Sequence, residues 1–149
     1  MATRKWLGGV TARAQVSTIV VGGTVAINDT IVITIGYSSI TVTATSTSTS
    51  TTASQVQAAL SASTAPPEFR EVTWTVNSST VTGTAKTAGV PFVVSTTPSA
   101  SVTANVTDTV SATGPNFANV AANWNAATLP TTGDTIVAED DAPSILYGL

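Results

Sequence analysis

Residues 30–35 read Thr-Ile-Val-Ile-Thr-Ile, and this stretch decides the fold class of the chain. Its three isoleucines occupy alternate positions, so they share one face of an extended strand. Residues 36–39 have the composition of a turn, and the alternation of apolar residues with Thr resumes from Ile40 to Ala44. The pattern predicts a β-hairpin with one apolar face.

The same alternation recurs further along the chain. It is found in residues 72–76, which precede a turn at 77–79 and a returning strand at 80–85, and a further short strand is expected at 92–95. Thr fills the other positions of these strands, and its β-branched yet polar side chain suits a solvent-facing or partner-facing sheet surface. We therefore predict a mainly β (α+β) fold, with an antiparallel sheet or sandwich.

One segment is predicted to be helical. Residues 52–55 (Thr-Ala-Ser-Gln) match a capping box, and apolar residues within 56–60 share one helical face. Pro66-Pro67 prevents the helix from continuing further along the chain. We expect one short helix at about 53–63. The Ser/Thr run at 45–51 is either the frayed end of the preceding strand or a flexible loop.

Composition excludes most kinds of catalytic site. The chain has 149 residues, of which 30 are Thr and 16 are Ser, and only 9% are charged. His and Cys are both absent. Their absence removes histidine acid–base chemistry, thiol nucleophiles, disulfides and almost every zinc site. We therefore expect a structural or binding protein, with no enzymatic activity, catalytic residue, metal or cofactor.

Two groups of acidic residues are candidate sites. Glu68 and Glu71 are three residues apart, but they flank a strand start beside Arg70, and a solvated ion cluster explains them better than paired catalytic carboxylates. The Glu139-Asp140-Asp141 triplet lacks the spacing of a calcium loop. We interpret it as a solvated or partner-facing acidic turn.

The charges are segregated along the chain. The first fifteen residues contain three cations and no acid, whereas every charged residue after Lys86 is acidic. The net charge is −3, and no concentrated basic face indicates a nucleic-acid partner. No apolar run approaches the roughly 18 residues of a membrane span, and none resembles a secretory signal. We expect neither nucleic acid nor membrane as a partner.

These features divide the chain into an N-terminal arm (1–15), a β-rich core (16–104) and a C-terminal β extension (105–149). The arm is either a frayed terminus or a docking arm, with Trp6 anchored in a neighbouring subunit and its cations meeting that subunit's acidic surface. The second hypothesis assigns these subunit-interaction residues: Arg4, Lys5, Trp6, Arg13, Asp134, Glu139, Asp140, Asp141, Ile145, Leu146, Tyr147 and Leu149.

Two stretches of the core carry a resemblance to a known group of proteins. Residues 66–74 (PPEFREVTW) and 84–95 (TAKTAGVPFVVS) resemble a small β-rich module found in structural proteins of tailed bacteriophages and related prophage regions. The resemblance covers roughly residues 16–95. It implies a virion location, a role in assembly or attachment, and capsid or tail subunits and further copies of the chain as partners. It supplies no catalytic residues.

The C-terminal extension carries a second resemblance. Asn123-Trp124-Asn125, Leu129-Pro130 and the Gly-Asp-Thr-Ile-Val run at 133–137 resemble the entry segment of parallel β-helix or adhesin-like regions. About a dozen residues follow Val137, too few for several rungs. Either the longer region was lost from this chain, or the segment closes a sheet or docks on a neighbour.

Together these patterns favour a non-catalytic virion protein, with capsid decoration or stabilisation as the leading role. The N-terminal attachment domain of a tail fibre or spike is an alternative. A carbohydrate-binding adhesin module, with Trp124 or Tyr37 as a sugar platform, is the alternative from another class.

Overall fold

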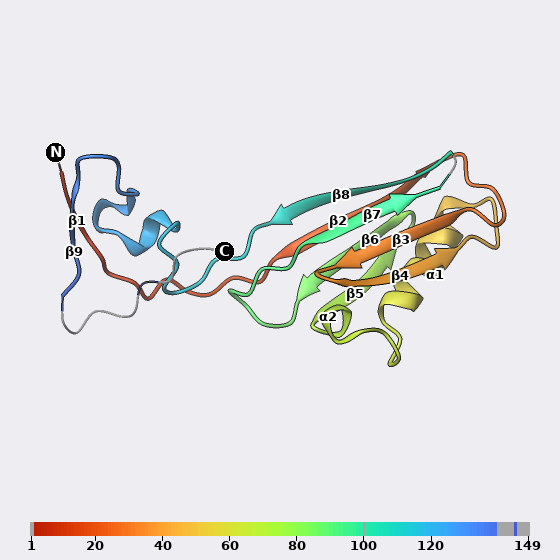
Figure 1. The fold of residues 1–149 in the computed structure, drawn as a ribbon, viewed down its shortest axis with the longest axis horizontal. Helices are drawn as coiled ribbons and strands as arrows, with labels where there is room; N and C mark the ends of the chain where they lie inside the picture. The colour runs from red at the N-terminus through yellow and green to blue at the C-terminus, as the bar shows by residue number, and fades with distance from the viewer. Residues whose placement is uncertain (1, 100, 140–144, 146–149) are drawn as a thin grey trace.

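The computed structural model describes residues 2–99, 101–139 and 145, and these form two lobes joined by a narrow neck (Figure 1). We call residues 15–110 the core lobe. Residues 2–10 and 114–139 form the terminal lobe, so segments from both ends of the sequence meet there. Residues 11–14 and 111–113 form the neck, where Arg13 and Thr113 make an antiparallel bridge.

The core lobe contains two antiparallel sheets. In spatial order, the four-stranded sheet is built from β5 (Val72–Asn77), β6 (Thr80–Ala85), β2 (Val16–Gly23) and β8 (Val102–Val110). The three-stranded sheet is built from β4 (Ser38–Thr43), β3 (Thr30–Ile35) and β7 (Val94–Pro98). This mainly β architecture confirms the predicted fold class.

Helix α1 (Thr49–Leu60) packs against strands of both sheets, β2, β5, β6 and β4. Its apolar face packs into one continuous core with the inward side chains of the strands and with Phe69; Ile19, Ile33 and Phe69 are all fully buried. Phe69 lies on α2 (Pro67–Arg70), a short helix that begins at the proline expected to act only as a helix breaker. Pro is favourable there because the first helical residue needs no amide donor.

One close approach fixes how β5 packs on β6. Trp74 pairs with Gly83, and a Cβ atom added to Gly83 would lie 2.5 Å from the Trp74 ring. The indole therefore lies across the glycine, and its Nε1 donates a 2.9 Å hydrogen bond to the Phe69 carbonyl. Only glycine leaves room for this arrangement.

The expected hairpins agree with the observed strands, but the start of the helix differs. Helix α1 begins at Thr49, where the Ser48 side chain accepts a hydrogen bond from the Thr51 amide. Thr52, predicted as the cap, instead donates its hydroxyl to the Ser48 carbonyl from inside the helix. The prediction of a start near residue 53 was wrong because several hydroxyl residues in a row compete for the cap.

The core also extends further than expected. Strand β8 pairs with β2 as far as Val110, past the boundary drawn at residue 104. A buried polar cluster supports this end of the sheet: the Gln15 side chain bonds both backbone polar groups of Phe92 and the Ser17 hydroxyl. Ser17 in turn bonds the Asp108 carboxylate. The cluster leaves the buried Gln15 amide satisfied.

Candidate interaction surfaces

The terminal lobe is formed by the expected arm and the expected extension together. Strand β1 (Thr3–Lys5) pairs in parallel with β9 (Thr135–Val137), and the Trp6 amide continues the pairing to the Val137 carbonyl at 2.8 Å. Figure 1 shows β1 and β9 side by side at the end of the molecule distant from the core lobe. The arm therefore contributes a strand to a sheet within its own chain.

A tryptophan pair forms the apolar centre of the terminal lobe. Trp6 is 1% exposed and Trp124 is 4% exposed, with ring centroids 5.0 Å apart in an edge-to-face arrangement. The Trp124 Nε1 donates to the Ala118 carbonyl at 2.8 Å. The structure thus replaces the expectation that Trp6 anchors in a neighbouring subunit, because Trp6 is buried against its own chain.

Two asparagines flanking Trp124 attach the N-terminal segment. Asn123 is fully buried: its Nδ2 donates to the carbonyls of Gly114 and Phe117, and its Oδ1 accepts from the Val10 amide. The Asn125 side chain accepts from the Lys5 amide and donates to the carbonyl of β1 residue Thr3. The Asn-Trp-Asn motif therefore joins the two ends of the chain.

The segregated charges meet within this lobe. Arg4 Nε lies 3.1 Å from Asp134 Oδ2, and the Asp134 side chain is 7% exposed. Hydrogen bonds from the amides of Ala2 and Thr131 and from the Arg4 guanidinium lower the pKa of Asp134 well below its usual value. Lys5 Nζ lies 2.6 Å from Glu139 Oε1 at the surface. The expected attraction between arm and extension occurs here inside one chain.

Of the remaining expected interaction residues, the structure describes only Arg13 and Ile145. Arg13 lies in the neck, and within the described part of the chain it forms no ion pair. Ile145 is half-buried. The other five predicted positions lie outside the described residues: Asp140, Asp141, Leu146, Tyr147 and Leu149.

The outward face of the four-stranded sheet, which we call the hydroxyl face, carries threonines in register. Thr75 pairs with Thr82, Thr82 with Thr18, and Thr18 with Thr107, so four threonines form one rank across all four strands. Neighbouring strands lie about 4.8 Å apart, which sets the spacing within the rank. Val20, 39% exposed, lies near the middle of the face.

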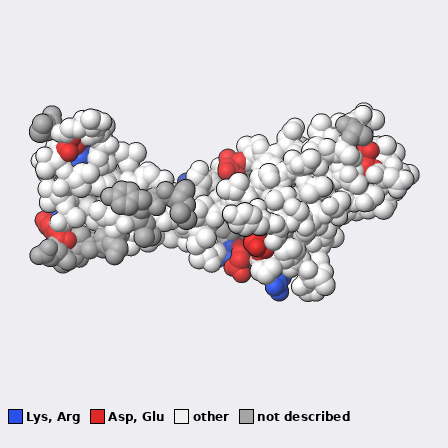
Figure 2. Space-filling view, in the orientation of Figure 1, with Lys and Arg blue, Asp and Glu red and all other residues white. Residues whose placement is uncertain are grey.

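Charged groups are scarce around this face. Among the residues of the seven core strands, all of them described, Asp108 is the only ionisable one, and it hydrogen-bonds inward-facing Ser17. Figure 2 shows few charged atoms on the visible side of the core lobe. The outward positions of the four-stranded sheet are Thr73, Thr75, Asn77, Thr80, Thr82, Thr84, Val16, Thr18, Val20, Gly22, Thr103, Asn105 and Thr107.

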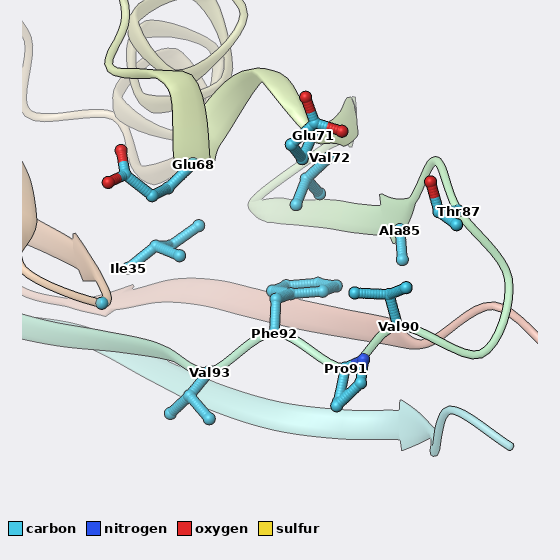
Figure 3. Close-up of a pocket in the computed structure, with 11 residues that line it drawn as sticks. Ile35, Glu68, Glu71, Val72, Ala85, Thr87, Val90, Pro91, Phe92 and Val93 are labelled. Atoms are coloured by element: carbon cyan, nitrogen blue, oxygen red, sulfur yellow. The ribbon is translucent and has the colours of Figure 1, made fainter. Parts of the chain in front are cut away.

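An apolar pocket of about 400 Å³, the Phe92 pocket, opens beside α2. Figure 3 shows Phe92 and Val90 facing Val72 and Ala85, with Glu68 and Glu71 on the opposite side of the opening. Within the described part of the chain neither carboxylate forms an ion pair. The pocket is lined by Ile35, Gly36, Glu68, Glu71, Val72, Ala85, Thr87, Val90, Pro91, Phe92 and Val93.

The sequence carries a signal for the pocket in the segment whose residues 92–95 are predicted to form a strand. Residues 90–94 read Val-Pro-Phe-Val-Val, an apolar run without the alternation of a half-buried strand. Strand β7 begins at Val94, so residues 90–93 form an apolar loop, with Val90 54% and Val93 79% exposed. Exposed apolar side chains grouped in one loop mark a candidate interaction site.

No protein-family model matches the chain, and no curated protein matches it. Among the described residues there is no group of three or more acidic side chains that would hold a metal ion. No helix in the described part of the chain is long and apolar enough to cross a membrane. The functional argument therefore rests on the two surfaces of the core lobe.

Proposed function

We propose that the chain is a non-catalytic structural protein of a phage-type virion that packs on capsid or tail subunits, most simply as a decoration or stabilising protein. The observation that carries the proposal is the hydroxyl face. Its outward residues are mostly Thr or Asn, and the registered pairs Thr75–Thr82 and Thr82–Thr18 place them in ranks.

The physical chemistry of this face suits contact with another protein. Covering a charge removes its hydration, which costs several kcal/mol unless a partner compensates, whereas a hydroxyl needs only one or two hydrogen bonds. The threonine methyl groups add apolar area between the hydroxyls. A charge-free face of this kind is inexpensive to cover, and on a particle many weak contacts sum through repetition.

The alternative role as a fibre or spike attachment domain has one supporting observation. The terminal lobe ends in the parallel pair β1–β9, and parallel pairing of short strands is the arrangement from which β-helices are built. Carbohydrate binding through Trp124 loses its support, because Trp124 is buried; Tyr37 remains fully exposed.

The test is the composition of particles from the organism that encodes the chain. We expect mass spectrometry of density-gradient-purified virions to detect the chain in many copies per particle. Replacing Val20 by Lys, in the centre of the hydroxyl face, should remove it from the particles, whereas Thr132→Lys on the terminal lobe should not. Purified virions that lack the wild-type chain would contradict the proposal.

A further inference from the structure

The turn of the β3–β4 hairpin carries Tyr37, whose side chain is fully exposed to solvent. Ile35 pairs with Ser38, so Gly36 and Tyr37 form a two-residue turn, with Gly36 at a φ of 59°. Tyr37 is 106% exposed, the most exposed of the large hydrophobic side chains in the described part of the chain. A tyrosine held on a tight turn loses little conformational freedom on binding, which makes it a favourable contact residue.

The Phe92 pocket has the complementary chemistry. Its walls are the apolar side chains of residues such as Val72, Ala85 and Phe92, while Glu68 and Glu71 stand at the opening. A phenol combines an apolar ring with one O–H donor, and a carboxylate is the strongest acceptor for that donor. The volume of about 400 Å³ is at the small end for ligand pockets, which suits one inserted side chain.

The side chain and the pocket lie next to each other on one surface. Ile35 and Gly36, the residues that precede Tyr37, themselves line the pocket. A two-fold axis beside them would place the tyrosine of each copy at the pocket of the other, so both pockets are filled in one closed interface. The exposed loop residue Val90, whose side chain faces the pocket in Figure 3, would be covered by the same contact.

We propose that two copies of the chain associate by reciprocal insertion of Tyr37 into the Phe92 pocket, with the phenolic O–H donating to a rim carboxylate of the other copy. This interface is independent of the proposed virion role, because it involves the purified chain alone. Among the described residues neither Arg70 nor Lys86 forms an ion pair with a rim carboxylate, and both line a second hollow of about 310 Å³.

The test is sedimentation velocity of the purified full chain across a concentration range. We expect a monomer–dimer equilibrium whose dissociation constant rises at least about 30-fold in Tyr37→Ala, as for a central anchor residue. Tyr37→Phe should raise it about tenfold through loss of the charge-assisted hydrogen bond. Glu68→Gln with Glu71→Gln should raise it similarly, and combining both changes with Tyr37→Phe should add little further.

A complementation experiment separates insertion from a general loss of folding. Ala85→Met fills the pocket but keeps Tyr37, whereas Tyr37→Ala keeps the pocket. Each variant alone should be largely monomeric, and an equimolar mixture should form heterodimers that retain one of the two insertions. Ile27→Ala, which removes another exposed apolar residue, from the β2–β3 loop, is the control and should dimerise like wild type.

Two results of the sedimentation experiment would overturn the inference. One is a wild-type chain that remains monomeric up to about millimolar concentration, because even a weak specific contact has a dissociation constant below that value. The other is a dimer whose dissociation constant is unchanged by Tyr37→Ala, since that dimer uses another surface. Retention of the wild-type chain on a polysaccharide column, lost in Tyr37→Ala, would also overturn it by assigning Tyr37 to sugar binding.

Discussion

The two lobes of this chain are stabilised by different means. The core lobe buries a continuous cluster of Val, Ile, Leu, Phe and Trp side chains between paired strands and a helix. In the described residues of the terminal lobe, Trp6 and Trp124 are the only buried hydrophobic ones, and the other attachments include backbone pairing and hydrogen bonds of asparagine and aspartate side chains. A small lobe can thus be ordered by a few anchors, but its local opening should cost less free energy.

The largest expected effect comes from emptying the core. Phe69→Ala removes a fully buried ring that packs beneath the strands, and we expect a loss of about 3–5 kcal/mol in the free energy of unfolding. Urea unfolding followed by far-UV circular dichroism measures it. Leu129→Ala, on an exposed terminal-lobe residue, should change stability by less than about 0.5 kcal/mol. Equal losses in the two variants would remove the distinction between the lobes.

The next effect should be confined to the terminal lobe. Asn123→Ala leaves the Val10 amide without its partner and removes one donor each from the carbonyls of Gly114 and Phe117, which costs about 1–3 kcal/mol. Hydrogen exchange should show lost protection in residues 2–10 and 114–139, with the core strands unchanged. Asn105→Ala on the hydroxyl face is the control and should leave both lobes protected. Simultaneous loss of protection in both lobes would mean that they unfold as one unit.

Acid should open the terminal lobe before the core. The pKa of Asp134 is lowered in the folded chain, so its contribution to stability is present above the ordinary aspartate pKa of about 4 and is lost as the pH falls below it. We expect exchange protection factors in β1 and β9 to fall below that pH while those of β2 stay constant. In Asp134→Asn, protection of β1 should be weak at every pH, and a wild-type acid dependence in this variant would exclude Asp134 as its source.

The smallest effect is expected at the surface ion pair. Lys5 and Glu139 side chains are 41% and 53% exposed, so Lys5→Met should cost less than about 1 kcal/mol of terminal-lobe stability. That loss should disappear in about 1 M salt, because the pair is screened. The measurement is exchange protection of β9 at low and high salt. A loss larger than that of Asn123→Ala would reverse the relative importance of ion pairs and asparagines.

Local patterns predicted the hairpins but not how distant segments combine. The strands β3, β5 and β6 follow from alternation and turn residues within a few positions of each other. The pairing of β1 with β9 joins segments at opposite ends of the sequence, and no short-range pattern specifies it. The opposite charges of the two ends indicated attraction, but charge alone does not distinguish contact within a chain from contact between chains.

The interaction surfaces follow the same rule. Thr on alternate strand positions was evident from the sequence, so a polar sheet face was predictable. The rank that joins Thr75, Thr82, Thr18 and Thr107 depends on cross-strand register, which a single strand does not encode. The Phe92 pocket likewise needs β3, α2 and the loop before β7 together.

The most direct test of the central claim, that the hydroxyl face is covered by a partner, uses a single introduced cysteine. The chain has none of its own, so maleimide labels only the chosen position. Val20→Cys reports on the hydroxyl face and Thr132→Cys on the terminal lobe. We predict that in purified virions position 20 is protected relative to the free chain while position 132 still reacts; equal labelling of position 20 in virions and in the free chain would contradict the account.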